Sequence, residues 1–294
     1  MIDYHLHLWP HTQRDKNLTL DFIASYWEKA CELGISEIAI TEHLFRFKQA
    51  DWLLSKWWEC EEDSLLLRHS MENYWYMHIG ADLDVYVDTI IEAKKAGIAV
   101  KLGLEVDFYR GKMDKVAKLL SDYPFDVLLG SVHWISTWRF DDLSDQISMD
   151  EWSLRDAKTA WSRYLGSLEE LLETKVVDVI AHPDLIKVAG FFPDEGFKRE
   201  FESSLVEIII KSELVTELSS AGWRKPVNEQ YPSIFVLSEL TKRNAKFTLA
   251  SDAHNINDVG SKVNKLRDIL HSLGLYKIAA FTQRTVKEIN LYDS

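Results

Sequence analysis

The regular alternation of short apolar runs with longer amphipathic stretches constrains the fold of this chain more than any other feature of its sequence. The amphipathic stretches have a helical period, and Gly34 and Gly97 mark the ends of two of them. Strands that alternate with helices form βα units and a parallel sheet. Seven such strands predict an α/β fold with a closed or nearly closed barrel. The strand-like runs are residues 2–6, 37–41, 99–105, 127–132, 176–181, 214–218 and 247–250, and the helix-like stretches include 20–33, 85–95, 113–120, 161–174, 198–211 and 233–243.

Two segments interrupt this alternation. Residues 45–83 contain four of the eleven tryptophans and many acidic residues, and we interpret them as a helical insertion after the second strand, near the active-site mouth. Residues 136–156 are polar and contain tryptophan, which predicts a long loop after the fourth strand. No linker, repeat or low-complexity segment is present, and 294 residues with 46% apolar content can bury a sizeable core. We therefore expect one domain over residues 1–294.

The charge and cysteine content exclude several classes of protein. The net charge of -13, without a basic run, disfavours nucleic-acid and membrane-surface binding, and an anionic substrate would need local positive charge. The two cysteines define no disulfide framework. No signal peptide and no apolar run of about 18 residues is found, so the expected location is cytoplasmic.

Six of the ten histidines lie at the C-terminal ends of predicted strands or directly after them. His5 and His7 form an H-x-H motif, and because alternate residues of a strand share a face, both imidazoles can bind one ion. The active sites of parallel barrels lie at the C-terminal ends of the strands. The candidates at this end are His5, His7, His43, Glu105, His133, His182, Asp252 and His254.

One strand-end histidine alone is more often a hydrogen-bonded structural residue than a metal ligand. A histidine or carboxylate at the end of six of the seven strands is what indicates a metal site. The loop after H-x-H offers a further ligand, for which His11 is favoured over Asp15. His69, His78 and His271 lie elsewhere in the pattern and are interpreted as surface or packing residues.

Imidazole and carboxylate ligands suit Zn, Mn or Fe better than Mg or Ca. Nine candidate ligands are too many for a single ion. The sequence therefore predicts two or three divalent transition-metal ions, with Glu105 as a bridge between them.

Seven motifs occur in an order that resembles the polymerase-and-histidinol-phosphatase (PHP) superfamily, and within it the histidinol-phosphatase branch. They cover nearly the whole chain: DYHLH, ITEH, KLGLEVDF, LGSVHWI, IAHPDLIK, ELSSAGWRKPVNEQYPS and ASDAHNINDVG. The most specific parts are KLGLEVDF followed by GSVHWI, and AGWRKP followed by SDAH. The resemblance implies a distorted seven-stranded (β/α) barrel with a trinuclear metal cluster.

The resemblance also implies which residues bind each ion. The loop after H-x-H is shorter than is usual in the family, which leaves the role of His11 and the filling of the third site open. The implied sets are His5, His7, Glu105 and Asp252 for one ion, Glu105, His133 and His182 for the second, and His11, His43 and His254 for the third.

The AGWRKP motif places Arg224 and Lys225 near the same face of the barrel, and Lys187 follows the fifth strand. Most lysines and arginines are solvated surface charges. Position and resemblance make Arg224 the expected phosphate-binding residue and Lys187 the second, because a guanidinium can hold two phosphate oxygens. Three divalent ions and two carboxylates would together carry a charge of about +4. Within the screening length of about 8 Å at physiological salt, this local positive charge outweighs the negative net charge of the chain.

The expected activity is phosphomonoester hydrolysis by attack of a metal-activated hydroxide on phosphorus, with Glu105, Asp252 and Arg224 as catalytic residues. L-histidinol phosphate is the substrate that the resemblance favours, which would place the enzyme in histidine biosynthesis. Another small phosphorylated metabolite or a nucleotide is the alternative. Hypotheses of other classes are an amidohydrolase-type or TatD-like hydrolase and a barrel that binds metal without catalysis.

Overall fold

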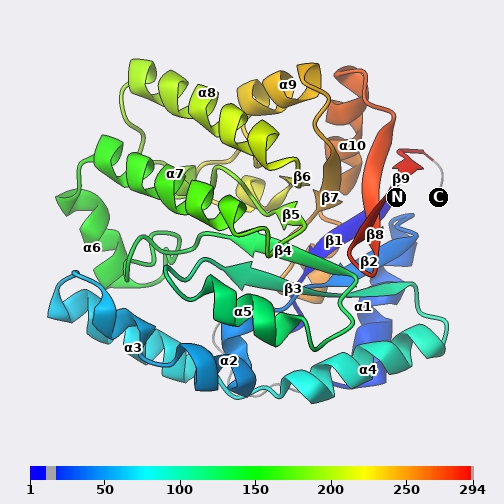
Figure 1. Ribbon diagram of the computed structural model, residues 1–294. Coiled ribbons are helices and arrows are strands. Elements are labelled where there is room, and N and C mark those ends of the chain that lie inside the picture. Colours follow the sequence, from blue (N-terminus) through cyan, green and yellow to red (C-terminus); the bar gives the residue numbers. More distant parts are fainter. Residues whose placement is uncertain (11–17, 293–294) are drawn as a thin grey trace.

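A seven-stranded parallel sheet forms the centre of the computed structural model, which describes residues 1–10 and 18–292 (Figure 1). The strands follow one another in chain order, as expected when a helix-containing connection joins each strand to its neighbour. The two edges of the sheet meet where Leu6 bridges Ala253 and the His7 N–H donates to the Ala253 carbonyl at 2.8 Å. The predicted α/β barrel is therefore confirmed as a sheet that nearly closes. Its strands are β1 (Ile2–Leu6), β2 (Glu37–Ile40), β3 (Val100–Asp107), β4 (Val127–Ser131), β5 (Val179–Ile180), β6 (Val215–Ser219) and β7 (Phe247–Ala250).

Helices surround this sheet and cover its outer face (Figure 1). The α-helices are α1 (Leu20–Glu32), α2 (Lys48–Leu54), α3 (Leu65–His78), α4 (Leu83–Lys95), α5 (Met113–Leu120), α6 (Gln146–Leu154), α7 (Ala157–Glu173), α8 (Glu195–Ser212), α9 (Ile234–Lys242) and α10 (Val263–Ser272). Short 3-10 helices are η1 (Leu44–Arg46), η2 (Trp57–Cys60), η3 (Leu185–Lys187), η4 (Ala221–Arg224) and η5 (Ile256–Asp258). No helix within the described residues is long and apolar enough to cross a membrane.

Local sequence determines where these helices begin and end. Thr19, Asp156 and Asp194 cap the N-termini of α1, α7 and α8, each accepting a hydrogen bond from a backbone N–H of the first turn. Gly34 follows α1 with a φ of 72°, a conformation that glycine adopts without steric cost. These signals are readable in the sequence, which is why the predicted helices agree with the observed ones.

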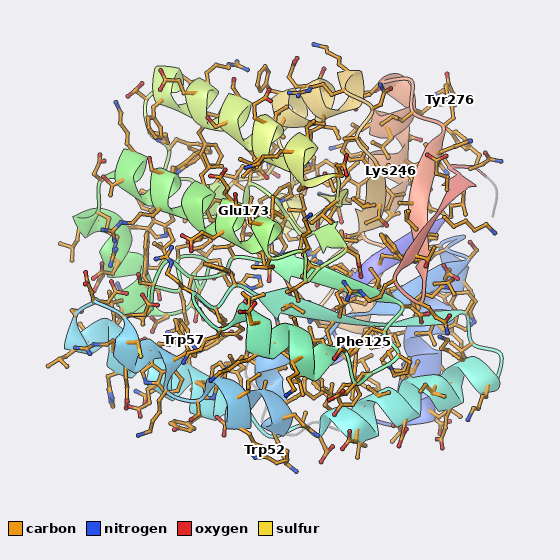
Figure 2. All side chains as sticks on the ribbon, in the orientation of Figure 1. Trp52, Trp57, Phe125, Glu173, Lys246 and Tyr276 are labelled. Atoms are coloured by element: carbon orange, nitrogen blue, oxygen red, sulfur yellow. The ribbon has the colours of Figure 1, made fainter. Side chains whose placement is uncertain are left out.

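The segment 45–83 forms η2, α2 and α3, which pack beside the sheet. Trp57 is buried, and its ring centroid lies 5.5 Å from that of Trp134. In contrast, Trp52 is 78% exposed and projects outward (Figure 2). The Trp75 indole donates a 2.7 Å hydrogen bond to Asp51. The tryptophans therefore anchor this helical segment to the loop that follows β4.

Two parts of the chain differ from the sequence-based expectation. Residues 136–156 contain α6 rather than a long loop alone. A hairpin of β8 (Lys277–Thr282) and β9 (Thr285–Asn290) was not predicted. The two turn residues, Gln283 and Arg284, have positive φ values of 48° and 61°. Hairpin turns with positive φ are usually formed by Asn-Gly or Asp-Gly, so a Gln-Arg turn could not be recognised in the sequence.

The hairpin lies at the N-terminal ends of the strands, opposite the strand ends that carry the histidines. The Arg284 N–H donates to the Asp126 carbonyl at 2.8 Å, just before β4. Its guanidinium contacts the Asp178 carboxylate, just before β5. The hairpin thus covers one end of the barrel and leaves the other end open for a functional site.

Candidate metal centre

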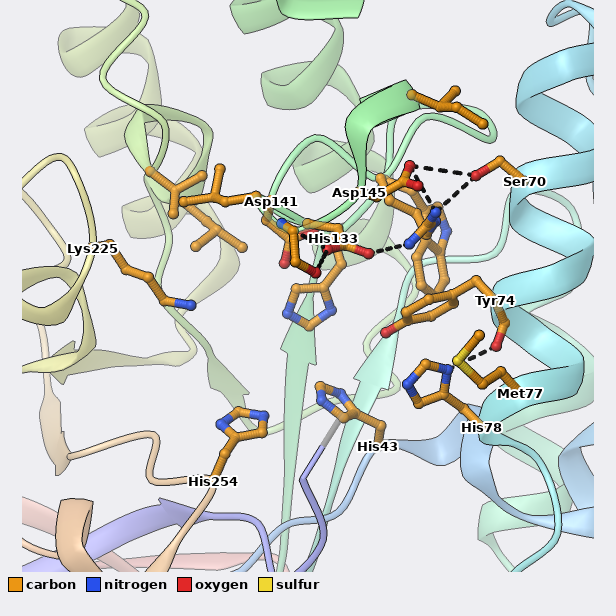
Figure 3. Close-up of a pocket in the computed structure, with 18 of the residues that line it drawn as sticks. His43, Ser70, Tyr74, Met77, His78, His133, Asp141, Asp145, Lys225 and His254 are labelled. Carbon is orange, nitrogen blue, oxygen red and sulfur yellow. Dashed lines mark hydrogen bonds and ion pairs between the residues drawn. The ribbon is translucent and has the colours of Figure 1, made fainter. Parts of the chain in front are cut away.

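The strand-end histidines and carboxylates converge at the C-terminal end of the barrel. His5 and Glu105 lie within strands β1 and β3, and the others follow directly after strands. Figure 3 shows His43, His133 and His254 facing one cavity from three different elements. The structure therefore brings together residues that are up to 249 positions apart.

The Glu105 carboxylate lies at the centre of this cluster. The nearest nitrogens are His43 Nδ1 at 2.8 Å and His182 Nε2 at 3.0 Å. The Nε2 atoms of His133, His5 and His7 follow at 3.3, 3.4 and 3.5 Å. Burial opposes ionisation of Glu105, but the surrounding imidazoles, His133 foremost, hold its pKa well below its usual range. One ionised carboxylate is therefore shared among five imidazoles.

Asp252 is the second carboxylate of the cluster. Its Oδ1 lies 3.5 Å from His7 Nε2, 3.8 Å from His5 Nε2 and 3.5 Å from His254 Nδ1. Asp252 has a φ of 52° and His182 a φ of 25°, both in a region that non-glycine residues rarely occupy. Backbone strain of this kind concentrates at functional sites, where the fold holds a side chain in a required direction.

Several buried atoms of the cluster lack a hydrogen-bond partner. Within residues 1–10 and 18–292, His5 Nε2, His7 Nε2 and Glu105 Oε2 make no hydrogen bond. Unpaired buried polar atoms are costly, and a cation would satisfy them. Burial also lowers the pKa of His43 to about 3, which leaves its imidazole neutral, as a metal ligand must be.

The ligand atoms fall into groups that could each hold a cation, with all atoms of a group within 4.8 Å of one another. Imidazole nitrogens and carboxylate oxygens of this mixture fit divalent transition metals. The groups are His5, His7 and Asp252; His5, Glu105 and His182; His43, Asp107 and His133; and His7, His43 and His254.

These groups correspond only in part to the sets expected from the sequence. His7 joins His43 and His254, where the expectation named His11. His11 and its rival Asp15 lie outside the described residues, so their role stays a prediction. Asp107 enters a group although the sequence analysis did not select it.

Three carboxylates behind the candidate ligands were missed from sequence. Glu217 Oε2 lies 2.7 Å from His5 Nδ1, and Asp107 Oδ1 lies 2.5 Å from His133 Nδ1. Glu42 accepts backbone hydrogen bonds from Leu8 and Trp9 and lies 3.6 Å from His7 Nδ1. A carboxylate on the far ring nitrogen fixes the tautomer that directs Nε2 to a metal.

These carboxylates also change the protonation of the histidines. Burial lowers the pKa of His5, but Glu217 and Glu105 raise it well above its usual value. Asp107 itself has its pKa raised to about 6, chiefly by burial. Asp107 shares the strand face of Glu105, two residues away, and this alternation is the signal that could have identified it.

A cavity of about 560 Å³ opens beside the cluster. Its walls combine the cluster with residues of α3, of the loop after β4 and of the loop after η4. Tyr74 and His78 from α3 line it, and His78 is buried with its ring centroid 4.1 Å from that of Tyr74, so it is a packing residue that also borders the cavity. His69 also borders the cavity but is largely exposed, and His271 lies in α10 away from it. The volume is that of a small-metabolite site.

The predicted phosphate-binding residues have different surroundings from those expected. Arg224 donates from one guanidinium nitrogen to the carbonyls of Ser251 and Asp252, at 2.7 and 2.9 Å. The buried Lys187 ammonium lies 2.8 Å from Asp184 and 2.7 Å from Glu229. Neither side chain lines the cavity, whereas Lys225 does (Figure 3).

The barrel and its cluster define a protein whose strand ends could hold several divalent cations at a cavity of metabolite size. The model of the PHP domain family matches residues 4–221, and the chain belongs to this family.

Curated relatives and a solved structure extend this assignment. The chain is 28% identical over 252 residues to a Deinococcus radiodurans protein named "Probable histidinol-phosphatase", covering 83% of this chain and 86% of the relative. It is 22% identical to a histidinol-phosphatase of Lactococcus lactis, covering 96% and 94%. The fold is similar to the crystal structure of a Lactococcus lactis histidinol phosphate phosphatase complexed with zinc, L-histidinol and phosphate. The TM-score is 0.71 at 19% identity, with 97% of this chain and 98% of that chain covered.

Proposed function

We propose that the protein is a metal-dependent phosphomonoester hydrolase and that its substrate is L-histidinol phosphate. The observation that carries this proposal is the convergence of six histidines, Glu105 and Asp252 at the edge of a cavity that also contains Lys225. Cations and a lysine beside a metabolite-sized cavity suit a phosphorylated ligand. The free cysteines Cys31 and Cys60 are compatible with the proposed cytoplasmic location.

The candidate ligands would hold two or three divalent transition-metal ions, with Glu105 shared between them. Such ions, when bound, lower the pKa of water and neutralise charge on a phosphoryl group. Glu217 and Asp107 would orient His5 and His133 toward the ions. The zinc in the similar Lactococcus lactis structure supports a transition metal here.

The phosphate group needs a cation from the protein as well. Lys225 lines the cavity, and in the described part of the chain its ammonium has no ion pair. Arg224 Nη1 makes no hydrogen bond within the same residues and lies beside the backbone of Asp252. We assign phosphate binding to Lys225, with Arg224 second, in place of Lys187, whose charge is already balanced by Asp184 and Glu229.

The choice of substrate rests on the relatives. Two curated relatives carry the name histidinol-phosphatase, and the similar solved structure contains L-histidinol and phosphate. Hydrolysis of another small phosphorylated metabolite is the second candidate, because the cavity volume alone admits many compounds of that size.

A phosphate-release screen with protein loaded with Mn or Zn tests the proposal. L-Histidinol phosphate should give the highest kcat/KM among phosphorylated metabolites that include sugar phosphates and nucleotides. Hydrolysis of p-nitrophenyl phosphate without activity on L-histidinol phosphate would reject the substrate and keep the reaction class. A metal-loaded protein that releases phosphate from none of these compounds would reject both.

A further inference from the structure

The cavity beside the metal centre is larger than a phosphate group requires, so part of it must receive the remainder of the substrate. The side chains beyond the candidate ligands determine which chemistry that remainder has. Its charged walls come from the loop after β4, which supplies Arg139 and three aspartates, and from Lys225.

Arg139 is already balanced by neighbouring groups. Its guanidinium pairs with Asp142, lies 3.0 Å from Asp145, donates to Ser70 at 2.8 Å and stacks 4.4 Å from the Tyr74 ring centroid. The two aspartates also accept hydrogen bonds from serine hydroxyls, Asp142 from Ser144 and Asp145 from Ser148 in the first turn of α6. The Arg139 cation is therefore fully paired, and both carboxylates are already engaged by Arg139 and by serine hydroxyls.

Asp141 differs from these two neighbours. Among the described residues, its carboxylate has no hydrogen bond and no ion pair within 4.0 Å, although it lines the cavity. Figure 3 shows Asp141 near His133, between Lys225 and Asp145. An anionic carboxylate in this place repels a purely anionic ligand.

The backbone around Asp141 is held in place by buried aromatic groups. Phe140 is fully buried, and its carbonyl accepts a 2.9 Å hydrogen bond from the Trp152 indole. The Trp138 indole donates to the Ser148 carbonyl at 3.0 Å. The carboxylate is therefore presented by a rigid loop, which is what specific recognition of a charged group requires.

We propose that Asp141 binds a protonated amine of the substrate while Lys225 and the metal centre bind its phosphate. The site then selects phosphomonoesters that carry an ammonium group close to the ester, over esters that are uncharged or anionic beyond the phosphate. This inference rests on the proposed phosphatase function and assigns the residue that sets its substrate class.

Binding of two phosphonates to the metal-loaded protein tests this selectivity without requiring turnover. Calorimetry should show that 3-aminopropylphosphonate binds more tightly than propylphosphonate, roughly 10- to 100-fold, which is the usual range for a hydrogen bond to a charged group. Asp141→Asn should reduce this preference to nearly 1. The same substitution should leave the metal content unchanged and should not weaken the binding of propylphosphonate, because it removes a carboxylate that repels a purely anionic ligand.

Asp142→Asn is the matched control, because it removes a carboxylate from the same cavity wall while Asp145 still pairs with Arg139. This variant should keep the amine preference. Equal affinities of the wild-type protein for the two phosphonates, or no binding of either, would overturn the proposal. So would an Asp141→Asn variant that retains the preference.

Kinetics separate amine binding from protonation of the leaving group. If Asp141 binds the amine, Asp141→Asn lowers kcat/KM for 2-aminoethyl phosphate but not for ethyl phosphate. Equal losses on both esters would assign proton transfer instead and overturn the proposal. Wild-type protein that prefers amine-bearing ligands but does not hydrolyse L-histidinol phosphate would reject the proposed substrate while keeping the role of Asp141.

Discussion

Glu105 is a buried charge whose environment consists mainly of imidazoles. Its carboxylate is buried among five imidazoles that lie within 3.5 Å. A neutral amide in its place would leave the imidazoles without an anionic partner and would replace one of the two shared oxygen ligands with an NH2 group, which does not bind a cation.

Glu105→Gln should therefore lose bound metal and activity together. We expect kcat/KM to fall by more than about 100-fold, beyond what substitutions behind metal ligands cause. Elemental analysis of the purified variant and phosphate release check this expectation. An active variant with unchanged metal content would contradict the assigned role.

Glu217 acts through His5, because its Oε2 forms a 2.7 Å hydrogen bond with His5 Nδ1. Glu217→Gln should weaken metal affinity roughly 10- to 100-fold, because the His5 ring loses the carboxylate that orients it. Metal titration with a competing chelator measures this change. Glu239→Gln, which alters a helix-surface residue paired with Lys242, serves as the control and should leave the affinity unchanged.

At the scale of the elements, the loop at η4 depends on close packing at Gly222. A Cβ on Gly222 would lie 2.0 Å from the Glu229 carbonyl and 3.0 Å from the Tyr231 ring. Gly222→Ala should destabilise the protein by about 1–3 kcal/mol, the usual cost of overpacking. Thermal unfolding measures the change in stability.

Gly166 provides the opposite case on α7, where an added Cβ has no atom within 4 Å. Gly166→Ala should stabilise the protein by about 0.5–1 kcal/mol through helix propensity. Stabilisation by Gly222→Ala, or a loss at Gly166 as large as at Gly222, would show that the packing argument is wrong.

The elements differ in how far the sequence determines them. Helices α5 and α8 could be predicted because apolar periodicity and, for α8, its cap agree. Strand β5 is shorter than the run 176–181 because only Val179 and Ile180 pair with both neighbouring strands. The hairpin was missed because β9 is exposed and has no apolar face to signal it.

The residues of the site also divide into those that could be predicted from the sequence and those that could not. His5, His43 and His182 could be selected because strand ends of a parallel barrel must meet. Lys225 could not be chosen over Arg224, because loop backbone geometry determines which of these two adjacent charges faces the cavity. Asp141 could not be distinguished from Asp142, because both line the cavity and only the structure shows that Arg139 pairs with Asp142.

For the whole molecule, metal binding should couple to global stability. A ligand that binds only the folded state stabilises it by about 4 kcal/mol when the free ligand concentration is 1,000 times the dissociation constant. Removal of metal with a chelator should lower Tm by on the order of 10 °C, and adding Zn or Mn should restore it. Calorimetry on the wild type and Glu105→Gln measures this, and a metal-dependent Tm in both would contradict a site centred on Glu105.

The meeting of β1 with β7 has a consequence for biosynthesis. Asp252 is translated almost 250 residues after its spatial neighbour His5. During most of translation, the emerging polypeptide has only a partial ring and an incomplete ligand set. The two candidate groups that include Asp252 or His254 must therefore wait for their cations until the seventh strand has been synthesised and has docked beside the first.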